Sequence, residues 1–228
     1  MIFEVKQMKI DEKDLLNSIL DSLSRIDYIK PEELPNIDLY MDQVTTFMDA
    51  QLATSKRYPE DKVLTKTMIN NYAKNNLLPP PVKKKYSKEH LLALIFIYYF
   101  KNILSIGDIQ AVLNPIMERY FASDINLNLE NIYSEVFHLE NAEILNLQED
   151  ITKKYHTSQK TFLNLDKNIK EEEKNDLQLF SFLCMLSFDV YIKKQLIEKI
   201  IDMQTTKNVT TTEKHTKNSE KHMKNFES

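Results

Sequence analysis

The sequence has 228 residues, of which 42% are hydrophobic and 28% charged, and its formal net charge is −4. This length suits one large domain or two small ones, and the composition excludes a disordered or fibrous chain. One cysteine excludes an intrachain disulfide framework, and one glycine argues against β-sandwiches, P-loops and dinucleotide-binding loops, which need several. We therefore expect a mainly helical protein.

The chain also lacks the features of a membrane or exported protein. No apolar run reaches the roughly 18 uncharged residues that a membrane span needs, and the first residues do not form an export signal. We expect a cytoplasmic protein that has no membrane partner.

Positive charge is concentrated in one part of the chain. Residues 56–101 contain 10 Lys/Arg and 3 Asp/Glu, whereas the segments before and after them are net acidic. A basic segment in an acidic chain is the pattern expected when one face of a protein meets a polyanion. A solvated lysine-rich face without a ligand explains the same pattern, and charge alone favours this explanation because such faces are common on soluble proteins.

The N-terminal part predicts a helix followed by a linker. Leucine and isoleucine recur at helical spacing over residues 11–26, and Pro31 and Pro35 then favour an extended chain. We place a boundary after this segment, so that residues 1–35 form an N-terminal helix and linker. A second helix is predicted over residues 39–52.

A short helix with two different faces is predicted over residues 64–76, with Thr65 as its N-cap. Its apolar residues share one face, while the other face is polar and partly cationic. Asn76 tolerates the left-handed conformation that ends a helix, and the prolines after it force an extended path. A basic segment, Lys83–Lys85, follows and ends at Tyr86.

The remaining chain predicts further helices. Residues 91–104 are apolar nearly all round, and a helix from residue 106 to 120 contains Pro115. Beyond these, residues 123–203 form a helical region. Its last helix, 177–203, is apolar on more than one side, and therefore has to be covered by several neighbours or by another subunit. The polar residues 204–228 predict a disordered tail.

The order of these elements resembles the DNA-binding domain of MerR-type regulators. The residues that carry the resemblance are Tyr72–Pro80, Tyr86–His90 and Leu104–Ile109. The resemblance implies a mainly α fold, with a winged helix-turn-helix (MerR-like) at residues 36–122 and a C-terminal helical dimerisation or bundle region.

The sequence departs from the MerR pattern at several places. It has Asn70 where arginine is usual, Asn76 where glycine is usual, a shorter wing, and an insertion around residues 53–62. Residues 38–87 are also similar to an uncharacterised bacterial family, domain of unknown function 1836, and this similarity is expected to cover most of residues 10–200.

These features predict a DNA-binding transcriptional regulator. Thr67, Asn70 and Asn71 are expected to contact base edges in the major groove, while the lysines neutralise phosphates. The full set of expected DNA contacts is Lys66, Thr67, Asn70, Asn71, Lys74, Lys83, Lys84, Lys85 and Tyr86. Duplex DNA and a second copy of the chain are the expected partners. The alternative is a helical protein–protein interaction module that keeps the fold without DNA binding.

No catalytic constellation is visible in the sequence. Glu135 and His138 have the spacing of a carboxylate-bridged di-iron motif, but such a site needs a second copy of the motif, which is missing. Cys184 lies among apolar residues, which favours an inert core thiol. We therefore expect no enzyme activity, no cofactor and no metal. The sequence does not identify a small-molecule effector.

Overall fold

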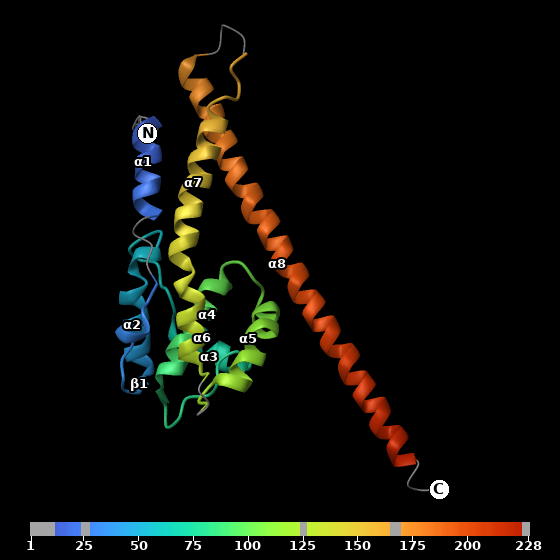
Figure 1. Cartoon of the computed structure of the whole chain (residues 1–228). Coiled ribbons are helices and arrows are strands. Elements are labelled where there is room, and N and C mark those ends of the chain that lie inside the picture. The colour runs from blue at the N-terminus through green and yellow to red at the C-terminus, as the bar shows by residue number, and fades with distance from the viewer. Residues whose placement is uncertain (1–11, 24–27, 124–126, 165–169, 225–228) are drawn as a thin grey trace, which may run out of the picture.

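The computed structural model describes residues 12–23, 28–123, 127–164 and 170–224 (Figure 1). It is mainly helical, as the composition predicts, and has a small antiparallel sheet in which Leu39 lies opposite Tyr86. The elements are, in chain order, α1 (Glu12–Leu23), η1 (Pro31–Glu33), β1 (Leu39–Tyr40), α2 (Met41–Gln51), η2 (Ala53–Ser55), α3 (Lys66–Lys74), β2 (Lys85–Tyr86), α4 (Lys88–Lys101), α5 (Ile106–Tyr120), α6 (Leu129–His138), α7 (Glu140–Ser158) and α8 (Glu171–Lys224).

Helix α4 forms the centre of the main core. Every residue from His90 to Tyr98 is buried, because α5, α6 and β2 surround the helix. Burial on all sides is what its all-round apolar sequence predicts. The core therefore fixes the positions of the shorter elements around α4, including α2 and α3.

Helix α3 has the boundaries that its capping residues predict. The Thr65 hydroxyl accepts a hydrogen bond from the Met68 amide at 3.2 Å, so Thr65 is confirmed as the N-cap. At the other end, the Leu77 amide donates to the Tyr72 carbonyl at 2.9 Å. This bond belongs to a Schellman motif, in which Asn76 is left-handed with φ 53°. Asparagine thus fills the conformation that glycine usually supplies.

The segment expected to be a linker packs into the main core instead. Ile29 and Leu34 are buried, and the Tyr133 hydroxyl donates to the Ile29 carbonyl at 2.6 Å. Tyr28 stacks on Phe137 of α6, with ring centroids 5.6 Å apart. Pro31 begins the short helix η1, and the apolar residues beside the prolines pack this segment against α6.

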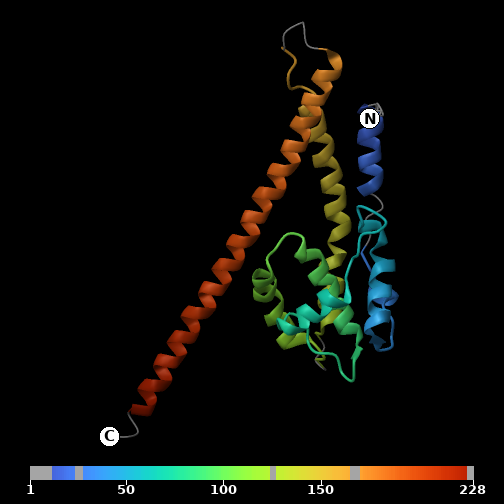
Figure 2. The same cartoon turned by 180° about the vertical axis from the view of Figure 1, so that it is seen from behind.

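Helices α1, α7 and α8 form a second, smaller core. Ile151, Tyr155 and Phe182 are buried there, and leucines of α1 pack against them. Lys154 of α7 forms ion pairs with Asp150 and with Asp189 of α8. Figure 2 shows α8 leaving α7 at an angle and passing alongside α5, where Ile201 joins the main core.

Helix α8 is longer than the sequence predicts. It continues to Lys224, across most of residues 204–228, for which the polar composition predicts a disordered tail. Residues 171–224 contain neither proline nor glycine, so nothing in the backbone ends the helix. None of the helices in the described part of the chain has an apolar stretch of the length that crossing a membrane requires.

Candidate nucleic-acid interface

The polar face of α3 is open to solvent. The five residues expected on this face are all exposed: Lys66, Thr67, Asn70, Asn71 and Lys74. The opposite face is held in the core by Ile69 and Tyr72, which are buried. The amphipathic pattern of the sequence therefore sets the rotation of α3, and no described residue covers its asparagines.

The lysines after α3 form the tip of a tight hairpin, which we call the lysine hairpin (residues 81–86). Val82 and Lys85 exchange two backbone hydrogen bonds, of 3.1 and 2.9 Å. Lys83 and Lys84 lie between them with φ of 51° and 66°. Two central residues with positive φ define a type I′ turn. The turn exposes both lysine side chains at its tip.

This turn is strained. Type I′ turns favour Asn-Gly, because the left-handed conformation costs other L-residues about 1–2 kcal/mol each. The lysine hairpin places a lysine at each of these two positions. Backbone strain of this kind concentrates at functional sites, where the side chain has a use that offsets the cost. The strain therefore marks Lys83 and Lys84 as candidate binding residues.

The start of α2 lies between α3 and the lysine hairpin and contacts both. Asp42 forms an ion pair with Lys66 at the start of α3. Two residues earlier, the Tyr40 ring lies under the Lys85 ammonium group, 5.3 Å from it. Residues 40–42 are therefore flanked by α3 on one side and by the hairpin on the other. The loop from α3 to α4 lies at the bottom of the view in Figure 1, whereas the C-terminal end of α7 lies at the top.

Other cations of the basic segment have structural roles. Lys56 pairs with Asp49 at 2.8 Å, and this pairing lowers the pKa of the Asp49 carboxyl. Lys88 pairs with Glu130 of α6 at 2.9 Å. The Lys101 ammonium group donates to the Val63 carbonyl at 2.6 Å, and burial lowers the pKa of Lys101. In the described residues, Lys74, Lys83 and Lys84 have no such partner.

The insertion after α2 does not join this surface. Residues 53–62 follow the C-terminal end of α2, whereas α3 begins beside the N-terminal end of α2, at Asp42. Arg57 is exposed there and lies over the Tyr58 ring at 5.3 Å. The basic segment of the sequence thus divides into a surface around α3 and the hairpin, and a separate group at the other end of α2.

The prediction that Tyr86 contacts DNA needs correction. Its side chain is only 3% exposed, because Tyr86 belongs to β2 and packs against the main core. Burial raises the pKa of its hydroxyl. Residues alternate between the two faces of a strand, so Lys85 points outward and Tyr86 inward. The Tyr86 side chain therefore anchors the end of the hairpin in the main core.

His90 is a further residue of this region, beneath the hairpin. The Ser87 amide donates to His90 Nδ1 at 3.0 Å, and His90 Nε2 lies 3.4 Å from the Pro80 carbonyl oxygen. The ring is buried, and desolvation lowers its pKa although the nearby Pro80 and Pro79 carbonyls and the Glu89 and Asp38 carboxylates act the other way. Its sequence position, beside Glu89 at the start of a helix, predicts a contact in the cap region or with the wing.

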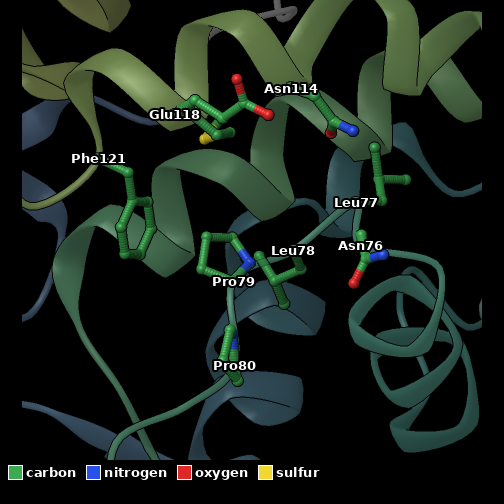
Figure 3. Close-up of a pocket in the computed structure, with 9 residues that line it drawn as sticks. Asn76, Leu77, Leu78, Pro79, Pro80, Asn114, Glu118 and Phe121 are labelled. Atoms are coloured by element: carbon green, nitrogen blue, oxygen red, sulfur yellow. The ribbon is translucent and has the colours of Figure 1, made fainter.

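A hollow of about 470 Å³ separates the end of α3 from α5 (Figure 3). It is lined by Asn76, Leu77, Leu78, Pro79, Pro80, Asn114, Met117, Glu118 and Phe121. Next to it, Gln110 of α5 donates to the Asn75 carbonyl, which ties α5 to the end of α3. The lining of the hollow combines apolar and polar side chains, with one carboxylate, Glu118, and no converging set of titratable groups. Among the described residues no cluster of ligands suits a metal ion.

The candidate interface lies within a region of the chain that matches a known protein family. The sequence profile described as "Domain of unknown function (DUF1836)" matches residues 29–136. This part of the chain is similar to that family. The match confirms the expected resemblance, although it is narrower than residues 10–200, and it begins with the segment that packs on α6. Comparisons with curated proteins and with solved structures give no match.

Helix α8 lies outside the region of the DUF1836 match, and it exposes a large apolar surface. Phe188, Ile192 and Leu196 recur at four-residue spacing and are 57–63% exposed. Up to residue 205, where the description of the α8 side chains ends, the large exposed apolar residues of the helix are Leu179, Phe180, Leu183, Phe188, Val190, Tyr191, Ile192, Leu196, Ile197, Ile200 and Met203. Apolar surfaces of this extent mark sites of protein association.

Proposed function

We propose that the protein is a transcriptional regulator that binds duplex DNA through a MerR-like winged helix-turn-helix at residues 36–122. In this proposal α3 is the recognition helix and the lysine hairpin is the wing. The observation that carries the proposal is the pairing of an exposed amide-bearing helix face with two lysines held at the tip of a strained turn.

The side chains of α3 have the chemistry needed to read bases. An asparagine amide offers a donor and an acceptor in one plane, and so can bind the N6 and N7 positions of adenine in the major groove. Asn70 and Asn71 are neighbours on the exposed face, and Thr67 precedes Asn70 by one turn. A hydroxyl hydrogen-bonds to bases, and its methyl group contacts the thymine methyl. These three residues are the proposed base contacts.

The lysines supply the part of the affinity that does not depend on sequence. Lys66 and Lys74 lie at the two ends of α3, and Lys83, Lys84 and Lys85 lie in the hairpin. Lysine binds phosphate as a point charge, and each neutralised phosphate contributes about 0.9 to the slope of log affinity against log salt. We therefore expect strongly salt-dependent binding even to random duplex.

We further propose that the protein is a homodimer, formed through α8. A helix whose apolar residues remain exposed in the single chain needs cover, and an isologous contact between two copies is the commonest solution. The row Phe188, Ile192 and Leu196 continues along the helix to Ile200 and Met203, past Asp189, which pairs with Lys154 of α7. A dimer would also present two α3 helices to two half-sites.

An electrophoretic shift with random duplex at low salt tests DNA binding. The test variant is K83A/K84A/K85A, and the matched control is K153A/K160A/K170A, which removes three exposed lysines from the other end of the molecule. We expect the wild type and the control to shift the duplex and the hairpin variant to shift it weakly. Equal binding by both triple variants would contradict the role of the hairpin.

The same experiment decides between the two functions considered. A wild-type protein that shifts no duplex at low salt would favour the alternative, a protein–protein interaction module that uses the basic surface on an acidic partner. Non-specific DNA binding follows phosphate contacts and needs no knowledge of the operator.

A further inference from the structure

We propose that His90 is a positioning residue for the lysine hairpin: its imidazole ring holds the two ends of the hairpin and thereby determines where Lys83, Lys84 and Lys85 lie. The inference rests on the proposed function for its effect on DNA binding. The geometry of the hairpin itself is independent of that function.

The ring of His90 contacts the backbone on both sides of the hairpin. Nδ1 accepts a hydrogen bond from the Ser87 amide at 3.0 Å, just after the hairpin. A backbone amide can only donate, so Nδ1 is unprotonated and the proton of the neutral ring is on Nε2. Nε2 then donates toward the Pro80 carbonyl, 3.4 Å away and just before the hairpin. One side chain therefore joins residues 80 and 87.

The ring cannot turn freely. It is 3% exposed and meets Phe121 edge-on, with ring centroids 4.8 Å apart. On the other side it meets Tyr86 at 5.4 Å, also edge-on. Phe121 follows α5 and Tyr86 belongs to β2, so the ring connects the base of the hairpin to two elements of the core. Such second contacts fix the rotamer of a residue that positions others.

Histidine can hydrogen-bond in two directions from the third position of the helix, where Glu or Gln is usual. The third residue of a helix often caps the chain before it, through the side chain of Glu or Gln. A glutamate would accept from Ser87 but could not donate to Pro80, and it would bury a charge. Neutral imidazole offers an acceptor and a donor on opposite sides of one rigid ring. The structure uses both, one for each end of the hairpin.

Charged groups near His90 come from two segments. Glu89 precedes it on α4, and Asp38 lies just before β1. From the side of α5, the contact with the ring is the uncharged Phe121. A proton added to Nδ1 would remove the acceptor that Ser87 uses, so the neutral ring is the form that positions the hairpin.

The test separates helix capping from hairpin positioning. H90Q keeps an acceptor for the Ser87 amide but lacks the rigid link to Pro80, and H90L lacks both bonds. D108A is the matched control, because Asp108 caps α5 in the same way, at 3.2 Å from the Ser105 amide, and does not touch the hairpin. The readout is the rate of tryptic cleavage after Lys83, Lys84 and Lys85 in the native protein without DNA, together with thermal stability.

We expect faster cleavage at the hairpin in H90Q, by roughly threefold to tenfold, which corresponds to the loss of one hydrogen bond, and cleavage at least as fast in H90L, which loses both. D108A should lower thermal stability but leave that cleavage rate unchanged. The ¹⁵N shifts of His90 in the wild type should report a proton on Nε2. Hairpin cleavage in H90Q and H90L at the wild-type rate, or a proton on Nδ1, would overturn the proposal.

DNA binding is measured separately on the same variants. If the hairpin lysines bind phosphates, H90Q should weaken the salt dependence of binding, whereas D108A, which also loses a capping bond, should leave it unchanged. Should the wild type bind no DNA while cleavage still depends on His90, the proposed function fails and the positioning role stands. Should the wild type bind DNA while cleavage is independent of His90, only the positioning role fails.

Discussion

Two surfaces of the molecule are exposed to solvent. One is polar and is formed by α3 together with the lysine hairpin; the other is apolar and lies on α8. The first consists of amides, a hydroxyl and ammonium groups, which water solvates well. The second contains phenylalanine, isoleucine and leucine side chains that are more than half exposed. An apolar surface of this extent favours association, whereas a polar surface is stable in water without a ligand. Under the proposed function, α8 would gain stability from a second copy of the chain, whereas the basic surface would need its partner only for function.

The largest expected effect comes from placing charge on the apolar row of α8. I192E/L196E should convert the proposed dimer into a folded monomer of 27.0 kDa, because two carboxylates cannot be buried in an apolar interface. Light scattering after size exclusion measures the mass. The control Q195E/K199E changes exposed polar residues of the same helix and should remain dimeric. A monomeric wild type would contradict the role of α8.

Replacing the amides of α3 should reduce sequence discrimination. N70A/N71A removes two proposed adenine contacts, each worth about 1–3 kcal/mol of discrimination, and leaves every lysine in place. Affinity for a selected genomic fragment should therefore fall, while affinity for random duplex and its salt dependence stay the same. The matched control is N146A/N164A, two exposed asparagines distant from α3. Equal loss on both duplexes would argue against base contacts.

Relieving the strain of the turn should raise the stability of the protein and lower its affinity for DNA. K83N/K84G introduces the residues that a type I′ turn favours, so the free energy of unfolding should rise by about 1–2 kcal/mol. DNA affinity should fall at the same time, because two charges are lost. K83A/K84A loses the same charges and keeps the strain. Urea unfolding of the three proteins measures the difference, and an unchanged free energy in K83N/K84G would show that the turn is not strained.

The smallest expected effect is a dependence of stability on pH. Burial lowers the pKa of His90 below its ordinary 6.5, so the unfolded chain binds this proton more readily than the folded one. The contribution is fully present above pH 6.5 and is lost as the pH falls from 6.5 toward the folded pKa. Thermal melting across this window should show a decline in the wild type that H90Q lacks. Parallel curves for the two proteins would contradict the assignment.

Much of the fold follows from patterns that are local in the sequence. Thr65, Asn76 and the apolar stripe with Ile69 and Tyr72 define α3, and the all-round apolar sequence of α4 predicts its central position. Each of these features depends on residues within a few positions of one another. Local capping and helical periodicity are therefore sufficient to predict them.

Contacts between distant residues are not visible in the sequence. The bond from Tyr133 to the Ile29 carbonyl spans 104 positions and turns the expected linker into part of the core. The burial of Tyr86 depends on its pairing with Leu39 in β1. The two bonds of His90 depend on the path of the chain between Pro80 and Ser87, which the positive φ values of the two lysines determine. Lysine gives no sequence signal for such a turn.

The salt dependence of binding to random duplex tests the proposed function most directly. A dimer that places Lys83, Lys84 and Lys85 of both copies on phosphates should bind with a steep negative slope of log affinity against log salt. The slope should become shallower by about 5 in K83A/K84A/K85A, which follows from about 0.9 for each of the lost contacts. Absence of binding by the wild type at low salt, or identical slopes for the two proteins, would contradict the account.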